Sequence, residues 1–176
     1  MLPLAVQNKN IFRLAAAQAL AGANSVVFYA TGAIVGNAIA PSPSLATLPI
    51  TLFVLGMAAS ILPFGALARK RGRKAAFMAG TGAGVVTGLA AALAVVLGSF
   101  LLFCFAAMLG GAYAAVALSF RFAATDGVAP ERRARALSLV MGGGVAAGII
   151  GPMLVTGTMH LWPTHTFAFT FLAQAL

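Results

Sequence analysis

The chain has 176 residues, of which 61% are hydrophobic and only 7% are charged, and its net charge is +9. Soluble domains carry roughly 25% charged residues, so these charges are too few to cover a surface that faces water. The composition therefore predicts an all-α membrane protein, a polytopic bundle of transmembrane helices in a lipid bilayer. It argues against nucleic-acid binding, because the basic residues fall in short segments beside apolar spans instead of on a soluble surface.

Apolar segments long enough to cross a bilayer, which takes about 20 residues, follow one another along the chain. The expected spans are residues 11–40, 46–68, 75–98, 100–120 and 136–160, and a sixth that begins at 167 and stops at 176, too short to cross. The Pro/Ser cluster 41–44 and the pair Gly98-Ser99 predict tight connections after the first and third spans.

The positive charges fall on one side of this arrangement. They precede the first span and follow the second and the fourth, whereas the connections after the first, third and fifth spans contain no Lys or Arg. Short basic loops stay on the cytoplasmic side of a membrane. The pattern predicts a cytoplasmic N-terminus and a multi-pass protein, and the heavy use of Ala and Gly favours a bacterial inner membrane.

Glycines four residues apart form stripes in three spans. Small residues at this spacing let a neighbouring helix backbone approach closely, although Gly-rich helices also produce such pairs by chance. The stripes are Gly32 with Gly36, Gly80 with Gly84 and Gly88, and Gly144 with Gly148. In the fifth span, Gly148 and Gly151 lie beside Pro152, which removes a backbone hydrogen bond and predicts a kink.

No arrangement of residues predicts catalysis, a metal site or a cofactor. His160 and His165 lie in a connection without a carboxylate or thiolate nearby, and are interpreted as interfacial residues. Asp126 and Glu131 both lie in the connection after the fourth span, so the spans hold no acid that a proton-coupled carrier would use. The chain is not expected to be an enzyme.

Uncharged polar residues within the spans are the remaining candidates for function. At 100° per residue, Gln18, Ser25 and Tyr29 share one face of the first span, and Asn24 lies on another face. Tyr113 is a weaker candidate in the fourth span. Such groups bind either a substrate or a neighbouring helix, because lipid offers them no partner. Both interpretations, a substrate pathway and contacts between helices, stay open.

The basic segment between the second and third spans carries a family resemblance. Residues 65–74 read GALARKRGRK, which resembles the signature G-x-L-a-D-R-x-G-R-[KR] of the major facilitator superfamily. Gly65, Gly72, Arg73 and Lys74 match, as do Leu67 and Ala68, whereas Arg69 replaces the acidic residue. The resemblance implies that this segment is a gating loop on the cytoplasmic side. The alternative, a segment that only sets topology, stays open.

Two later stretches extend the resemblance along the chain. Gly148 to Pro152 is similar to a Gly-Pro motif of antiporters, and the connection with Arg121, Asp126 and Arg133 looks like that of a bacterial branch. The resemblance implies that residues 1–176 are the N-terminal six-helix half of a twelve-helix transporter. Such a transporter moves a small-molecule substrate by alternating access, inward or outward.

The partner of this half would be a missing C-terminal half or a second copy of the chain. Two other classes stay open: a truncated fragment that does not transport, and a small self-associating membrane protein.

Overall fold

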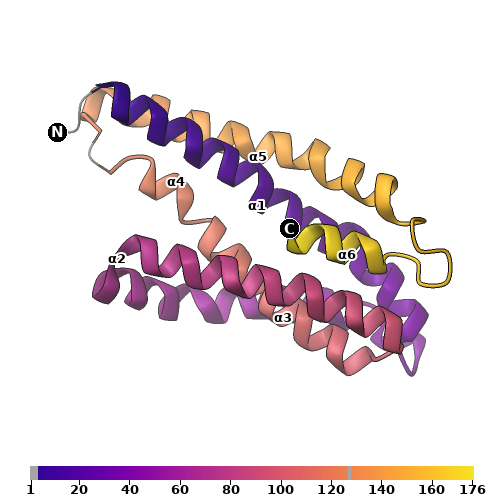
Figure 1. The fold of residues 1–176 in the computed structure, drawn as a ribbon. Helices are drawn as coiled ribbons and strands as arrows, with labels where there is room; N and C mark the ends of the chain where they lie inside the picture. The colour runs from indigo at the N-terminus through magenta and orange to yellow at the C-terminus, as the bar shows by residue number, and fades with distance from the viewer. Residues whose placement is uncertain (1–3, 127) are drawn as a thin grey trace.

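The computed structural model describes residues 4–126 and 128–176, and the described residues form helices and no strand. This confirms the all-α class. Figure 1 shows the order of the elements along the chain. They are α1 (Leu4–Ile39), the 3₁₀ turn η1 (Pro43–Leu45), α2 (Leu48–Leu97), α3 (Phe100–Ala117), α4 (Phe120–Ala123), α5 (Pro130–Thr158) and α6 (Ala168–Ala175).

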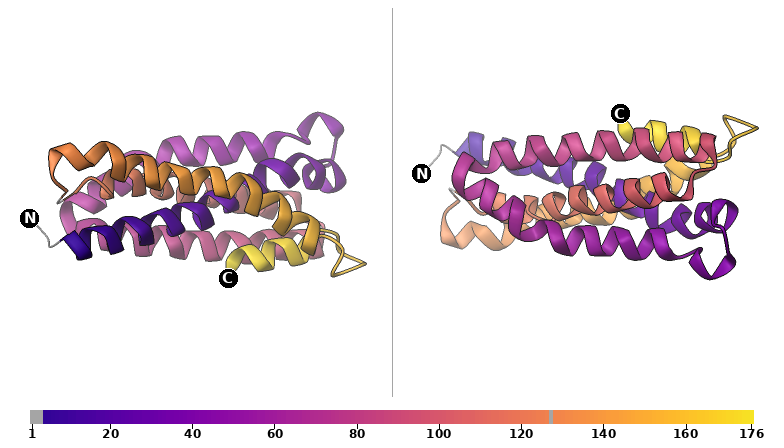
Figure 2. Two further views of the ribbon diagram at one scale, coloured as in Figure 1. Left: turned by 90° about the horizontal axis from the view of Figure 1, so that it is seen from above. Right: turned by 90° about the horizontal axis from the view of Figure 1, so that it is seen from below.

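The long helices run side by side along one axis (Figures 1 and 2). Helix α1 lies beside α5, α3 lies beside the two arms of α2, and α6 packs between the two groups. Four helical segments of the described chain are long and apolar enough to cross a membrane. They are Gln7–Ile39, Pro43–Leu97, Phe100–Ala123 and Pro130–Thr158.

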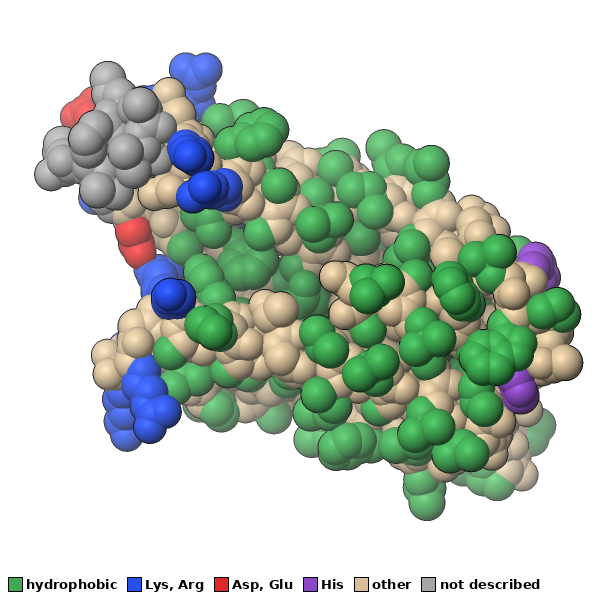
Figure 3. All heavy atoms as spheres, viewed as in Figure 1, with side chains coloured by type: hydrophobic (Ala, Val, Ile, Leu, Met, Phe, Trp, Pro, Cys, Tyr) green, Lys and Arg blue, Asp and Glu red, His purple; other side chains and the backbone are tan. Residues whose placement is uncertain are grey.

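Figure 3 shows the Lys and Arg side chains of the visible face gathered at one end of the bundle, and the histidines at the other. The start of α1, the bend of α2 and the start of α5 all lie at the basic end (Figure 1). The band between the two ends is mainly hydrophobic on this face. The bundle thus has the charge asymmetry of a membrane protein whose basic end stays in the cytoplasm.

The expected loop between the second and third spans is a bend inside one helical element. Helix α2 is 50 residues long, and within it only Gly72 has non-helical angles, with φ 84° and ψ 161°. Helical angles continue on both sides of this residue, so α2 consists of two helical arms joined at Gly72, and the connection is shorter than the expected loop. The chain reverses at one glycine, because a left-handed φ of this kind is accessible to Gly and costly for other residues.

The fifth helix starts at Pro130, earlier than the expected start at residue 136. Proline is favoured in the first turn of a helix, and Glu131 in that turn interacts favourably with the positive end of the helix dipole. As a result, Arg132, Arg133 and Arg135 lie on helix α5 and not in a loop. The expected span was based on hydropathy, and the residues from Pro130 to Arg135 are mostly polar. The first turns of the helix were therefore left out of the expected span.

Aromatic rings fill the centre of the bundle toward the end opposite the basic residues. Phe28 of α1 stacks on Phe53 of α2 and Phe103 of α3, with ring centroids 5.4 and 6.1 Å apart. Phe171 of α6 contacts Phe28 and Phe103, each at 5.5 Å. In lipid such contacts stabilise mainly by packing, because the lipid tails are as apolar as the helices.

The glycine stripe of the third span forms close helix contacts, as predicted. A Cβ atom on Gly80 would lie 2.7 Å from the Val116 side chain of α3, and one on Gly84 would lie 3.1 Å from the Tyr113 ring. A Cβ on Gly88 would lie 2.6 Å from the carbonyl oxygen of Phe171 in α6. In the first span, Gly36 contacts the backbone of residue 46 and Gly32 the side chain of residue 50.

The stripe expected in the fifth span receives no neighbouring helix among the described residues. A Cβ on Gly144 or Gly148 would meet no atom within 4 Å among the described residues. The face that packs on α1 carries Gly143 and Gly151. A Cβ on Gly143 would collide with the carbonyl oxygen of Ala15, and one on Gly151 would lie 2.6 Å from the Val26 side chain. Helix α5 runs on through Pro152, and the kink there stays a prediction.

Candidate functional site

The bend of α2 presents the basic signature to the outside of the bundle. Arg69, Lys70, Arg71 and Lys74 are exposed, and Arg73 is partly covered. A Cβ added at Gly72 would meet nothing within 4 Å, so space is not the reason for glycine at this position. The reason is the backbone angle, which lies in a region that only glycine occupies readily.

An ion pair joins this bend to the segment that follows α4. The Nε atom of Arg73 lies 2.7 Å from Oδ2 of Asp126, and the two side chains are 41% and 55% exposed. Exposed pairs of this kind contribute about 0–1 kcal/mol, so this one adds little to stability. It links the bend to the segment that follows α4. The sequence offered one signal for it, since both acids of the chain lie on the cytoplasmic side.

Other arginines of the basic end make separate contacts. The Nε atom of Arg133 donates to the carbonyl oxygen of Val128 at 3.3 Å. The Nε atom of Arg121 is buried and has no hydrogen-bond partner among the described residues. Arg69 forms no ion pair in the described part of the chain. The structure therefore brings Arg73 and Asp126 together and leaves Nε of Arg121 without an acceptor among the described residues.

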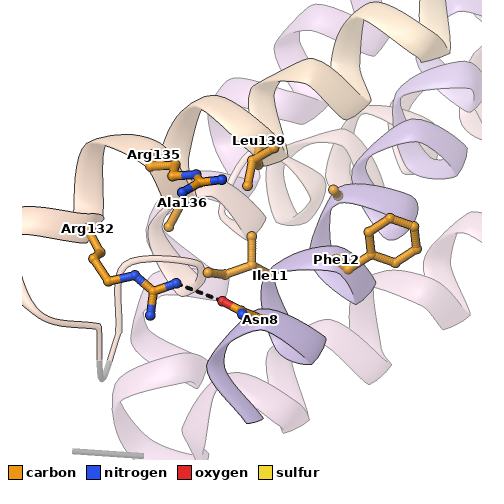
Figure 4. Close-up of a pocket in the computed structure, with 8 residues that line it drawn as sticks. Asn8, Ile11, Phe12, Arg132, Arg135, Ala136 and Leu139 are labelled. Carbon is orange, nitrogen blue, oxygen red and sulfur yellow. Dashed lines mark hydrogen bonds between the residues drawn. The ribbon is translucent and has the colours of Figure 1, made fainter. Parts of the chain in front are cut away.

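A recess at the basic end lies between the starts of α1 and α5. Figure 4 shows Arg132 reaching from α5 to Asn8 on α1, where its Nη2 atom donates to Oδ1 at 2.8 Å. Phe12 and Leu139 form apolar parts of the wall, and Arg135 also lines the recess, whose volume is about 360 Å³. The hydrogen bonds of Arg132 hold the two helix starts together, which the sequence gave no reason to expect.

The polar stripe of α1 lies on a partly uncovered face. Tyr29 is 48% exposed, and its ring meets the edge of Phe53 with centroids 5.4 Å apart. Gln18 and Ser25 are half-buried. None of the side-chain hydrogen bonds found among the described residues involves the Gln18 amide. A polar group at this depth needs an acceptor or donor, which lipid does not provide.

Asn24 and Tyr113 line one cavity of about 370 Å³, together with Gln174 of α6. Asn24 is only 7% exposed, and its Oδ1 accepts a hydrogen bond of 2.6 Å from Nε2 of Gln174. Oε1 of Gln174 is buried and has no partner in the described part of the chain. Nearby, the Thr158 hydroxyl donates to that of Thr170 at 2.9 Å. Asn24 thus connects α1 to α6, and sequence reasoning did not single out Gln174.

No group of three or more His, Cys, Asp or Glu side chains that could hold a metal ion occurs among the described residues. Arginines lie at the basic end of the bundle, and the amides of Gln18 and Asn24 lie within the first span. These groups bind and orient a solute through hydrogen bonds and charge.

Comparison with known proteins assigns this geometry to a family. The pattern of the Major Facilitator Superfamily matches residues 14–176. The riboflavin transporter RfnT of Brucella anthropi is 41% identical over 168 residues, which cover 96% of this chain and 42% of the relative. No solved structure gives a significant match.

A second relative is less similar and carries no assigned substrate. The uncharacterized MFS-type transporter YdeG of Bacillus subtilis is 29% identical over 147 residues, which cover 84% of this chain and 34% of the relative. The chain thus spans less than half the length of the curated relatives that it matches.

Proposed function

Because the chain belongs to the Major Facilitator Superfamily, we propose that it forms the N-terminal half of a transporter that moves a small solute by alternating access. It is a multi-pass protein of a bacterial membrane. The observation that supports the proposal most is the partly exposed polar stripe of Gln18, Ser25 and Tyr29. Polar groups at membrane depth that lack partners in their own bundle are expected to line a water-filled pathway.

The stripe would face the second half of the transporter. In transporters built from repeats, the substrate site lies near the bilayer midplane between the two units. The C-terminal half of the same protein is the proposed partner, since the relatives are more than twice as long as the stretch they share with this chain. A second copy of the chain is the alternative partner. We propose no catalytic role for any residue.

Replacing Gln18 with leucine is expected to reduce transport by the complete protein about tenfold, which corresponds to losing about 1.4 kcal/mol of binding at the pathway. Asn37→Leu is a matched control, because Asn37 is an exposed amide about 100° away around the axis of α1. Uptake into proteoliposomes measures both variants. Equal loss in both, or none in Gln18→Leu, would contradict the pathway.

Riboflavin is the first solute to test, because the relative with 41% identity is named a riboflavin transporter. Riboflavin has a flat aromatic ring with amide-like edges. The Tyr29 ring offers such a ring a stacking surface, and the Gln18 amide can both donate and accept hydrogen bonds. We expect the complete protein in proteoliposomes to take up or release labelled riboflavin. The same assay with and without a pH gradient tests coupling to protons.

The Arg73–Asp126 pair is proposed as part of the cytoplasmic gate, which opens and closes as the halves rock. Asp126→Asn is expected to change stability by no more than about 1 kcal/mol, because the pair is exposed. Transport should fall several-fold, since the bend would lose its connection to the start of α5. Exchanging the two charges, Arg73→Asp with Asp126→Arg, should restore part of the rate. If the exchange restores nothing and Asp126→Asn transports normally, the pair has no gating role.

A further inference from the structure

A cavity at the basic end combines apolar walls with two arginines. It lies between the two arms of α2, the end of α3 and helix α4, and its volume is about 370 Å³. The basic groups that line it are Arg73 and Arg121. The walls are mostly apolar and include Ile61, Phe64, Ala68, Phe77, Val116 and Phe122. This combination suits an amphiphilic molecule, whose charged end would meet the arginines and whose hydrocarbon end would meet the apolar walls.

Arg121 supplies a buried donor that the described chain leaves unused. Its Nε atom is buried without a hydrogen-bond acceptor, and its guanidinium carbon lies 5.1 Å from the centre of the Phe122 ring. The Arg121 residue as a whole is only partly buried, but a buried N–H donor without an acceptor is costly, and an anion that reaches Nε would remove that cost. Arg73 lines the same cavity, but its Nε already donates to Asp126.

Neither acid of residues 1–176 pairs with Arg121 in the part of the chain that the structure describes. It has eleven Lys and Arg residues and two acids, and one of these acids is already engaged by Arg73. The other, Glu131, lies in the first turn of α5 and forms no ion pair within the part of the chain that the structure describes. Arg73 and Arg121 place the cavity toward the basic end of the bundle (Figure 3). The anionic headgroups of the cytoplasmic leaflet attract clusters of Lys and Arg.

We propose that this cavity binds an anionic phospholipid of the cytoplasmic leaflet. The lipid phosphate accepts hydrogen bonds from Arg121, and one acyl chain lies along the apolar wall of α2. Arginine suits this role, because its planar group can donate two hydrogen bonds to one phosphate. A free phosphate ion would satisfy Arg121 but leave the apolar wall uncovered. The site would make the bend of α2 sensitive to the charge of the surrounding membrane.

Binding of phosphatidylglycerol to the purified chain in detergent micelles tests the proposal, with native mass spectrometry as the readout. Arg121→Gln is expected to weaken this binding about tenfold, through loss of charged hydrogen bonds to the phosphate. Arg71→Gln is the matched control. It removes the same charge from an exposed position that does not line the cavity, so its binding should stay within about twofold of the unchanged chain.

Two further arms make the test specific. Ala68→Phe fills the cavity without changing charge and should also weaken binding, which keeps the proposal testable if Arg121→Gln does not fold. Phosphatidylcholine and inorganic phosphate should not compete with phosphatidylglycerol. If Arg71→Gln weakened phosphatidylglycerol binding as much as Arg121→Gln, the lipid would be held by diffuse attraction to the basic end. If inorganic phosphate competed fully, the cavity would be a simple anion site. Either result would overturn the proposal.

Discussion

Replacing Gly72 with leucine is expected to lower transport by the complete protein to background, although the variant still inserts into the membrane. Gly72 has φ 84° and ψ 161°, in a region that is nearly exclusive to glycine. A side chain there costs about 1–3 kcal/mol even though no atom obstructs it. The chain can avoid this strain only by changing the angle between the arms of α2, which would displace Arg73 from Asp126.

Gly82→Leu is the control for this prediction. Gly82 lies in the same helix, has helical angles, and a Cβ there would also meet nothing within 4 Å. Transport is measured in proteoliposomes, and insertion by the amount of folded protein recovered from the membrane fraction. Normal transport by Gly72→Leu would show that the bend sets topology only. Loss of insertion in the same variant would point to a folding role instead of a gate.

Gly65 is the signature residue for which neither the backbone angles nor a close contact gives a reason. It has helical angles, and a Cβ on it would meet nothing within 4 Å. Glycine in a helix interior costs about 1 kcal/mol relative to alanine, so its presence needs another explanation. Gly65 lines the cavity that also holds Arg73 and Arg121, so a side chain at this position would narrow that cavity. Gly65 and Gly72 therefore share one signature for different physical reasons.

The fold class and the cytoplasmic location of the basic end could be predicted from the sequence. Both depend on the lengths of apolar segments and on the positions of Lys and Arg. Apolar segments of the right length and the one-sided placement of Lys and Arg are both visible without coordinates. The bend at Gly72 was expected as a loop, because the basic residues on either side of it interrupt the apolar pattern from which the helices were predicted. For the same reason, α5 was expected to start after the basic residues and not at Pro130.

The interior of the bundle could not be predicted in this way. In a soluble protein an apolar face indicates the core, but in a membrane both faces of a helix are apolar. Leu20 is 67% exposed and Phe28 only 2%, although both lie in the apolar part of the same helix. Contacts between residues far apart in the sequence are equally hard to predict. The contact of Arg73 with Asp126 and that of Asn24 with Gln174 depend on how distant helices pack.

The glycines of α5 give the sharpest example, and they carry the second prediction. Gly143→Ala is expected to destabilise the chain, because the new Cβ would collide with the carbonyl oxygen of Ala15 and lie 3.3 Å from the amide nitrogen of Ala19. Both atoms belong to the backbone of α1, so no side chain can turn away. Overpacking of this kind costs about 1–3 kcal/mol, more than the helix propensity gained.

Gly144→Ala is the matched control, one residue along the same helix. Its Cβ would meet nothing within 4 Å, so it should gain up to about 1 kcal/mol from the better helix propensity of alanine. The test is thermal unfolding of the purified chain in detergent. The melting temperature should be lower for Gly143→Ala than for the unchanged chain, and unchanged or higher for Gly144→Ala. The opposite order would restore the stripe of Gly144 and Gly148 as the packing face. Equal shifts would mean that α5 packs loosely on α1, and that neither face is specific.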